Sequence, residues 1–407
     1  MASQRLDYDD AYTTRFTARI VREGEHAGRP ALELESTYFY PESGGQEADR
    51  GVIGDRAVID VQTDDAGTVW HAVTPAAAAA AAAEGAAVAG ETPAEIDWPR
   101  RFDHMQVHTG QHILSAAFER ELGAATKSSR LGDERCTIEV DLRTSDWRAI
   151  ERVERAANAV VWEDREVLRH WVDDEGVRRF ALRKPPVVTG RIRIVEIPDW
   201  DVSACGGTHV RRTGEVGLIK VLRWERVRDN VRFEFVCGGR ALADYGWRTE
   251  ALLEAARRRT LHDRQLIEHL EKAATERDEL AKRVRDLGAR VAAAEAAERV
   301  AGTPGAVVEF RGRWPREEAR TFAFKCLELG AAWIAVAAGA PEPFVMLARP
   351  KSGTGDLRTL APELSRHAGG KGGGSAESVF VTAGDAAAAR AALEWASREC
   401  GSLIGGS

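Results

Sequence analysis

The sequence contains no apolar run that approaches the ~18–20 residues a helix needs to cross a lipid bilayer. Its first residues, MASQRLDYDDAY, also lack the positive charge and the apolar stretch of a secretion signal. Cysteine is scarce, with five residues that are odd in number and widely scattered. A disulfide framework is therefore not expected, and we predict a cytoplasmic chain whose thiols are free to bind metal.

Positive charge is in deficit, because 64 acidic residues outnumber 57 basic ones and leave a net charge of −7. This excludes attraction of the whole chain to nucleic acid by bulk charge, although a local basic patch can still act. Hydrophobic residues at 44% and charged residues at 30% are typical of a globular protein and not of a disordered one. A length of 407 residues predicts two or three domains of roughly 100–200 residues each.

The pattern of apolar residues changes along the chain. Residues 12–72 alternate apolar and polar positions in short segments, which predicts β-structure. Residues 98–240 predict an α+β domain in which one long helix, ending at Gly123, packs on an antiparallel sheet. The strands expected in this sheet are residues 136–142, 191–197 and 231–237. The alanine run Ala76–Ala83 could form a short helix, but it has nothing large to bury and we assign it no chemical role.

Residues 247–298 contain no proline and a single glycine. Apolar residues recur there at seven-residue intervals in two complementary series, which is a coiled-coil pattern. The series are Leu266, Ala273, Leu280, Leu287 and Ala294, and Leu270, Val284 and Val291. The pattern is compatible with a homodimer and equally with a helical hairpin that packs its two halves together. The segment AGTPGA at 301–306 is a linker signal, and a separate α/β domain is expected after it.

Two histidines, His108 and His112, occupy the segment HTGQH of the long predicted helix. A spacing of four places both imidazoles on one helix face, about one turn apart, where they can share a metal ion. Taken alone this pair is weak evidence, because such histidines often have no ligand.

A second pair, Cys205 and His209, is separated by two glycines and a threonine, which suits a tight loop. One thiolate with three imidazoles is a tetrahedral ligand set that fits zinc better than magnesium or calcium. We therefore predict one Zn²⁺ per chain, bound by His108, His112, Cys205 and His209. An unrelated zinc peptidase is disfavoured, because HTGQH lacks the glutamate of the HExxH motif.

A third feature lies upstream, in the segment YFYPESGGQ that ends at Gln46. Its two glycines, Gly44 and Gly45, permit close approach of the backbone to a ligand. From this segment alone, an ordinary turn between strands is the simpler interpretation.

These motifs follow one another in a recognisable order between about residues 30 and 245. The series is FYPESGGQ, HTGQHILSAAF, SSRLG, IRIVEI, ACGGTHV, TGEVGLIK and FEFVCGGRAL. It resembles the editing domain of alanyl-tRNA synthetases, and most closely the freestanding AlaX-type alanyl-tRNA editing proteins. The segment Gly369–Ser375 resembles the glycine-rich motif of the C-terminal domain that these synthetases share with DHH-type phosphoesterases, as in the long AlaX form.

Together with the patterns above, the resemblance implies an α+β fold of four parts. These are an N-terminal β-barrel-like domain (1–95), a zinc-containing α+β editing domain (96–245), a helical coiled-coil or hairpin spacer (246–300) and a C-terminal glycine-rich α/β domain that binds tRNA (301–407). The implied activity is hydrolysis of the ester in tRNA(Ala) mischarged with serine, with glycine as a second candidate. No segment resembles the ATP-binding core of the synthetases, so aminoacylation is not expected.

The resemblance also implies contacts to the substrate. Gly44, Gly45, Gln46 and Thr208 are the candidates for binding the aminoacyl end of the tRNA. For the rest of the tRNA, the candidates are Lys371 with Gly370 and Gly372, because bare amides and one cation can cradle phosphate, and the basic residues Arg183 and Lys184.

Two other functions are compatible with the same residues. One is a non-catalytic, zinc-stabilised tRNA-binding protein, and the other is editing of a different mischarged tRNA such as threonyl-tRNA. A homodimer could form through the spacer or the C-terminal domain, and no membrane partner is expected.

Overall fold

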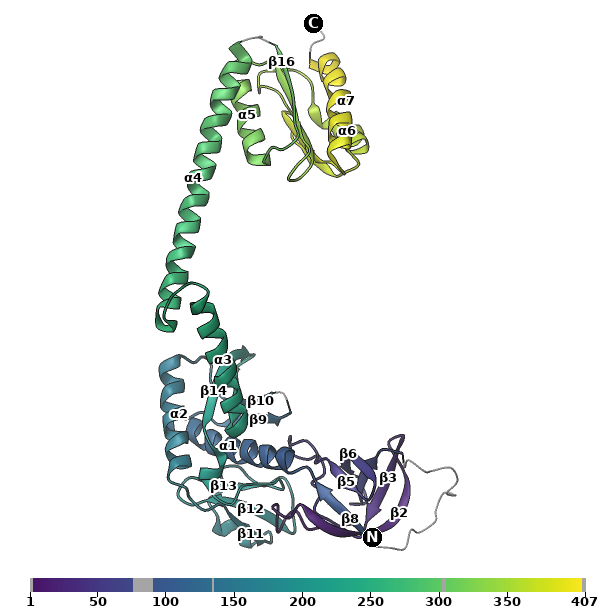
Figure 1. The fold of residues 1–407 in the computed structure, drawn as a ribbon, viewed down its shortest axis with the longest axis vertical. Coiled ribbons are helices and arrows are strands. Elements are labelled where there is room, and N and C mark those ends of the chain that lie inside the picture. The colour runs from purple at the N-terminus through teal and green to yellow at the C-terminus, as the bar shows by residue number, and fades with distance from the viewer. Residues whose placement is uncertain (1–2, 76–90, 134, 302–304, 405–407) are drawn as a thin grey trace. The chain divides into compact units, whose positions relative to one another are not determined.

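The computed structural model describes residues 3–75, 91–133, 135–301 and 305–404, and the chain divides into two compact units, Met1–Glu254 and Ala255–Ser407 (Figure 1). The mixed α and β composition expected from the sequence is confirmed. The alanine run Ala76–Ala83 lies outside the described residues, as do positions 302–304 of the linker segment. Within the described ranges, no helix is both long enough and apolar enough to span a membrane.

Six strands of the first unit pair in a ring and close a barrel. In ring order they are β2 (Arg15–His26), β3 (Arg29–Leu34), β7 (Val69–Val73), β6 (Arg56–Thr63), β5 (Gly51–Ile53) and β8 (Glu91–Ile96). Every neighbouring pair is antiparallel. Val58 and Val61 of β6 are both buried, although they are three residues apart, because the register of the strand shifts between Val58 and Asp60. Two short strands, β1 (Gln4–Arg5) and β4 (Ser36–Thr37), pair in parallel.

The long helix α1 (Trp98–Leu122) carries the HTGQH segment. Asp97 caps its first turn by accepting a hydrogen bond from the Arg100 N–H at 3.2 Å. The helix ends at Gly123, whose φ of 63° lies in the left-handed region that favours glycine, so the predicted end is confirmed. All residues from 107 to 118 are buried, which withdraws the histidines of this helix from bulk solvent.

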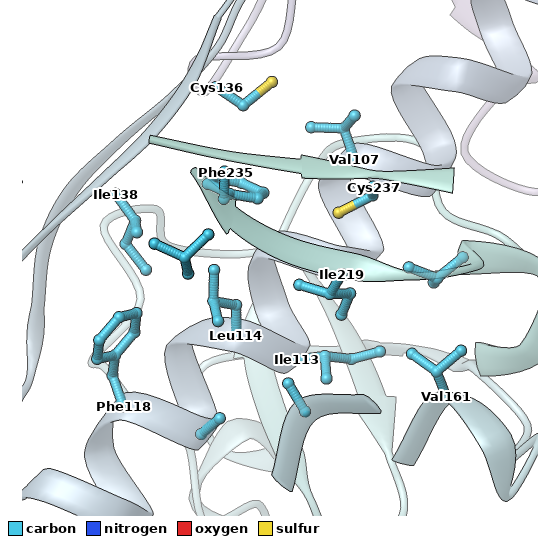
Figure 2. Packing of buried hydrophobic residues seen from close by; sticks show 14 of the residues in the cluster. Val107, Ile113, Leu114, Phe118, Cys136, Ile138, Val161, Ile219, Phe235 and Cys237 are labelled. Atoms are coloured by element: carbon cyan, nitrogen blue, oxygen red, sulfur yellow. The ribbon is translucent and has the colours of Figure 1, made fainter. Parts of the chain in front are cut away.

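Two antiparallel sheets accompany α1, and the expectation of a single sheet was wrong. One contains β14 (Ile219–Val227), β15 (Asn230–Cys237), β10 (Cys136–Val140) and β9 (Thr126–Leu131), and the other contains β11 (Leu168–Val172), β12 (Ile192–Ile197) and β13 (Asp201–Ala204). β12 pairs with β11 on one edge and with β13 on the other, so it lies in the second sheet and not beside β10 or β15. Helix α2 (Trp147–Trp162) packs against α1, and Figure 2 shows Phe118, Ile138 and Phe235 in their common core.

The second unit contains a five-stranded sheet in the order β16-β17-β18-β20-β19. Its elements are α4 (Leu266–Ala301), β16 (Ala306–Arg311), α5 (Arg316–Glu328), β17 (Trp333–Ala338), β18 (Phe344–Ala348), α6 (Ala361–Ala368), β19 (Gly372–Gly374), β20 (Ser378–Thr382) and α7 (Ala386–Ile404). Ile334 and Val336 of β17 pack with α4 and α5, whereas Trp333 and Ala335 pack with α6 and α7. Helices therefore cover both faces of the sheet (Figure 1).

The predicted spacer is divided into two helices. α3 (Gly238–Arg257) ends before a short 3₁₀ turn at Asp263–Gln265, and α4 then runs without interruption for 36 residues. Ala292 and Ala296, near the end of α4, are buried in the core of the second unit. Several residues of the heptad series remain exposed, namely Leu270, Leu280, Val284, Leu287 and Val291.

Candidate metal centre

Four side chains from two distant segments converge at one point. His108 and His112 come from α1, where their ring centroids lie 5.3 Å apart, and Cys205 and His209 come from the loop after β13. Cys205 Sγ lies 3.3 Å from His108 Nε2 and 3.2 Å from His209 Nε2. The ligand atoms of all four residues lie within 4.8 Å of one another. One thiolate and three imidazoles gathered in this way could hold a metal ion.

The loop that carries Cys205 depends on a close approach of its backbone to α1. Its start is held by the β12–β13 pair, and the Cys205 N–H donates to the Arg193 carbonyl at 3.0 Å. A Cβ atom at Gly207 would overlap the imidazole ring of His108, whereas at Gly206 the nearest atom, in the Tyr8 ring, is 3.7 Å away. Glycine is therefore required at 207 by contact with a candidate ligand, and not at 206.

Gly207→Ala is expected to lower metal affinity by about 10–100-fold, because the added methyl group would displace the His108 ring. Loss of the correct orientation of one ligand usually lowers metal affinity by about this factor. Gly206→Ala is the matched control, because its added methyl group would make only ordinary van der Waals contact. The measurement is a competitive titration of each purified protein with a chromogenic zinc chelator. Equal affinities for the two variants would show that the ring contact does not position His108.

Each of the three histidines is oriented by a polar partner on its Nδ1 atom. His108 Nδ1 donates to Gln46 Oε1 at 2.7 Å, and His112 Nδ1 donates to Asp201 Oδ2 at 2.9 Å. His209 Nδ1 lies 3.1 Å from Thr109 Oγ1. A neutral ring that donates from Nδ1 presents an unprotonated Nε2, so in this form the partners direct the Nε2 lone pairs toward the common centre.

Asp201 connects the centre to a charged neighbour. Its Oδ1 accepts a hydrogen bond from Arg183 Nε at 2.6 Å, and its Oδ2 accepts one from Ser203 Oγ at 3.0 Å. Burial raises the pKa of Asp201, but the hydrogen bond and charge of His112 and the Arg183 guanidinium outweigh burial and lower it to about 2. Burial lowers the pKa of His112, but the hydrogen bond to Asp201 and the neighbouring Cys205 raise it to about 9. The carboxylate therefore stays ionised at neutral pH and anchors the His112 ring.

The thiol of Cys205 lies in surroundings that favour its ionised form. Burial raises its pKa, but the adjacent His108 and His209 lower it well below the ordinary value. Burial also lowers the pKa of His209 well below its ordinary value, so this imidazole stays neutral. The Cys205 thiolate and the neutral His209 imidazole are the forms in which these two groups bind metal.

A cavity of about 930 Å³ opens over the centre. His108, His112 and Cys205 line it, whereas His209 is fully buried behind them. Another part of the wall is aromatic and cationic: Tyr8 meets Trp171 edge to face at 5.5 Å, and the Arg191 guanidinium lies 4.1 Å from the Trp171 ring centroid. The arrangement presents three candidate ligands at the wall of a cavity large enough for a small ligand.

Of the four predicted substrate contacts, Gly44 lies in the cavity wall, and Gly45, Gln46 and Thr208 are not among the described lining residues. Gln46 is fully buried. Its Nε2 donates to Thr208 Oγ1 at 2.8 Å, and its Oε1 accepts from the Thr208 N–H at 3.2 Å as well as from His108. Gly45 has a φ of 87°, and a Cβ atom there would lie 2.9 Å from the Ser129 carbonyl oxygen. The glycines thus form the turn that delivers Gln46 to His108.

The predicted RNA-binding residues lie in both units. Arg183 binds Asp201 and its side chain is 11% exposed, whereas Lys184 is exposed where it lines the cavity. In the second unit, Lys371 is exposed next to strand β19. A Cβ atom at Gly370 or Gly372 would overlap backbone carbonyls of β20, so close strand contact explains these glycines.

Sequence reasoning missed Asp201, Thr109 and Arg193. Asp201 and Thr109 orient His112 and His209, and Arg193 donates to two carbonyls of the Cys205 loop. The available signal was proximity, because Thr109 adjoins His108 and Asp201 lies four residues before Cys205. Spacing alone could not show that these side chains point toward the ligands.

Comparison with known proteins agrees with this geometry. Residues 192–233, which include the Cys205 loop, match the family model for the threonyl and alanyl tRNA synthetase second additional domain. The chain is 36% identical over 299 residues to the alanine–tRNA ligase of Pyrococcus abyssi, covering 70% of this chain and 31% of the ligase. It is 39% identical over 261 residues to that of Methanopyrus kandleri, covering 27% of that enzyme. The chain thus spans about a third or less of these ligases.

A freestanding relative matches over almost its whole length. The alanyl-tRNA editing protein AlaX-L of Pyrococcus horikoshii is 30% identical over 396 residues, which cover 91% of this chain and 92% of that protein. A match over 91% of the chain includes most of both compact units. The chain therefore belongs to the AlaX-type alanyl-tRNA editing proteins, which are related to the alanine–tRNA ligases.

Proposed function

We propose that this protein is a zinc-dependent, trans-acting deacylase that hydrolyses the ester of Ser-tRNA(Ala), with Gly-tRNA(Ala) as a second substrate, and that it has no aminoacylation activity. The observation that carries the proposal is the convergence of His108, His112 and Cys205 on the wall of a 930 Å³ cavity, with His209 behind them. Family membership supplies the tRNA system. The need for such an activity has a physical cause. An apolar aminoacylation pocket that binds alanine discriminates poorly against serine, which adds one hydroxyl.

Zinc fits the donor set of one thiolate and three imidazoles. When bound, it would polarise the ester carbonyl and lower the pKa of a water molecule. The orientation of the three imidazole rings would be fixed by Gln46, Asp201 and Thr109. His209 is fully buried whereas His108, His112 and Cys205 line the cavity, so the substrate would meet the centre on the side of these three residues.

We assign the substrate contacts to both units. Gly44 and the aromatic wall would bind the aminoacyl-adenosine end, and Gln46, Gly45 and Thr208 would act by positioning the ligand histidines. Lys184 at the cavity is exposed and available to phosphate. Arg183 would act in the same region through Asp201.

The division of labour along the chain is also a proposal. The segments 1–95 and 96–245 would carry out the editing reaction, 246–300 would be the spacer, and 301–407 would hold the tRNA body through Lys371 with Gly370 and Gly372. The exposed heptad residues of α4 support a homodimer through the spacer. We place the activity in the cytoplasm, where aminoacyl-tRNAs are used.

The proposal is tested by deacylation of five aminoacyl-tRNAs side by side with the zinc-loaded protein. These are Ser-tRNA(Ala), Gly-tRNA(Ala), Ala-tRNA(Ala), Ser-tRNA(Ser) and Ser-tRNA(Thr). We expect Ser-tRNA(Ala) to be hydrolysed at least about 100-fold faster than Ala-tRNA(Ala), because a site built to bind a hydroxyl rejects the analogue that lacks it. A parallel assay with ATP, alanine and uncharged tRNA should yield no product.

Each other result selects a different function. Preferential hydrolysis of Ser-tRNA(Thr) would favour editing of mischarged threonine tRNA. The family model, which includes threonyl-tRNA synthetases, suggests this alternative. Tight tRNA binding without hydrolysis of any substrate would favour a zinc-stabilised binding protein. Equal rates on all five would remove the claim of specificity.

A further inference from the structure

One guanidinium in the cavity wall has more hydrogen-bond donors than its protein contacts require. Arg193, on strand β12, lines the cavity and is 4% exposed. Its Nη1 atom donates to the carbonyls of Cys205 and Gly207, both at 2.9 Å. Its Nε and Nη2 atoms have no hydrogen-bond partner among the residues that the structure describes. Support of the Cys205 loop therefore accounts for the role of one nitrogen, Nη1, and assigns no role to the other two.

Among the residues placed by the structure, no carboxylate pairs with Arg193 as a dedicated counter-charge. The nearby carboxylate of Asp7 is bound by Arg5, whose Nε and Nη2 donate to its two oxygens, each at 2.6 Å. The other close negative group is the Cys205 thiolate, which belongs to the candidate ligand set. Burial lowers the pKa of Arg193, as expected for a desolvated cation. Buried donors without partners are unfavourable, so such a group is normally completed by a ligand or by water.

The shape of the free edge indicates what would complete it. Nε and Nη2 present parallel N–H donors in one plane, which match two oxygens carried by a single atom. Two groups of an aminoacyl-tRNA end have this form. One is the reacting carbon of the ester, which bears two such oxygens in the tetrahedral intermediate and in the carboxylate product. The other is the phosphate that precedes the terminal adenosine.

The position of the edge favours the reacting carbon. Arg193 holds the carbonyl of Cys205 itself, so its guanidinium adjoins the loop that carries a candidate ligand. Arg191 and Lys184 also line the cavity, and both are exposed, which suits a phosphate better than a buried side chain does. Tyr8 lies over the Arg193 guanidinium, with 5.7 Å between Arg193 Cζ and the ring centroid. This ring is only half-buried, so a ligand would reach the edge by displacing Tyr8 and not a core side chain.

We propose that the Nε–Nη2 edge of Arg193 binds the two oxygens on the reacting carbon during deacylation, which makes Arg193 a further catalytic residue; this inference rests on the proposed function. Water adds to the carbonyl carbon, the bond from that carbon to the ribose oxygen breaks, and the ribose oxygen takes a proton. The second proton of the water passes to solvent and a serine carboxylate remains. The negative charge that develops on the oxygens is stabilised by the preorganised donors of Arg193.

The test compares Arg193→Met and Arg193→Lys with Arg349→Met. Arg349 is the matched control, because it is also a buried arginine that donates to loop carbonyls, those of Gly353 and Gly355, but it lies in the second unit and is not among the described residues that line the cavity. The substrates are Ser-tRNA(Ala) and 3′-O-seryladenosine, which lacks the phosphate. Rates are expressed per bound zinc, so that a loss of metal is not counted as a loss of chemistry.

Arg193→Met is expected to lower kcat by about 100–1,000-fold on both substrates, with KM changed by only a few fold. Arg193→Lys should recover part of the rate, since it restores a cation without the parallel donors, and Arg349→Met should stay within about threefold of the wild type. L-serine should bind the zinc-loaded wild type more tightly than L-serinamide, which lacks the carboxylate. Arg193→Met should abolish that difference in calorimetry.

Two results would overturn the inference while the proposed function stands. If kcat per zinc is unchanged on both substrates, Arg193 only supports the loop. If the variant loses affinity for Ser-tRNA(Ala) and retains full activity on seryladenosine, the edge binds phosphate. If the wild type deacylates neither substrate, the proposed function fails, and the serine and serinamide titrations decide alone whether the edge binds a carboxylate.

Discussion

Cys205→Ala is expected to abolish stoichiometric zinc binding and to lower the deacylation rate by about 10³-fold or more, because a metal contributes several kcal/mol to stabilising the transition state. Cys205 contributes the thiolate of the candidate set, and it lies within 3.3 Å of two of the three ring nitrogens. Its removal leaves three imidazoles without a charged ligand. Metal per chain is measured by mass spectrometry after dialysis, and the rate is measured with Ser-tRNA(Ala).

Two further variants make this test specific. Cys326→Ala also removes a buried thiol, but in the core of the second unit, and should retain one zinc per chain. Asp201→Asn keeps the size of a side chain that orients His112 and should lower zinc affinity by only about 10–100-fold. A Cys205→Ala protein with full metal content and full activity would show that the four residues do not form the zinc site.

Arg101→Met is expected to destabilise the first unit by about 3–5 kcal/mol, the usual effect of removing one partner from a buried ion pair. The Arg101 guanidinium is fully buried and donates from Nε to both oxygens of Asp49 at 3.0 Å. It also donates to the carbonyls of Ala11 and Tyr38, each at 2.6 Å. Because Arg101 lies in the first turn of α1 and Asp49 precedes β5, this cluster joins the helix of the metal centre to the barrel.

Hydrogen exchange in the intact protein measures this effect, as the free energy of opening for amides in α1 and in the barrel strands. The control is Arg223→Met, which breaks an exposed two-bond pair with Glu234 and should change stability by less than about 1 kcal/mol. Adding Asp49→Asn to Arg101→Met should restore part of the loss, because it removes the unpaired buried charge. Similar small changes in both single variants would contradict the assigned role of the cluster.

The sequence by itself determined features that depend on neighbours along the chain. The spacing of four between His108 and His112 places both rings on one helix face whatever surrounds the helix. Gly123 ended α1 as predicted, because left-handed backbone is a local preference of glycine. The types and order of the four candidate ligands also required no structure, since ligand chemistry belongs to the side chains.

Tertiary structure decided which distant groups meet. It placed β12 between β11 and β13, in a sheet separate from that of β10 and β15. It also placed Gln46 behind His108, where the amide binds protein atoms, although its sequence motif had suggested a substrate contact. The free edge of Arg193 carried no local signal, and the position of Asp201 near Cys205 in the sequence did not show that its carboxylate binds His112. These arrangements depend on how whole strands and helices pack in the core, and the spacing of residues along the chain does not encode that packing.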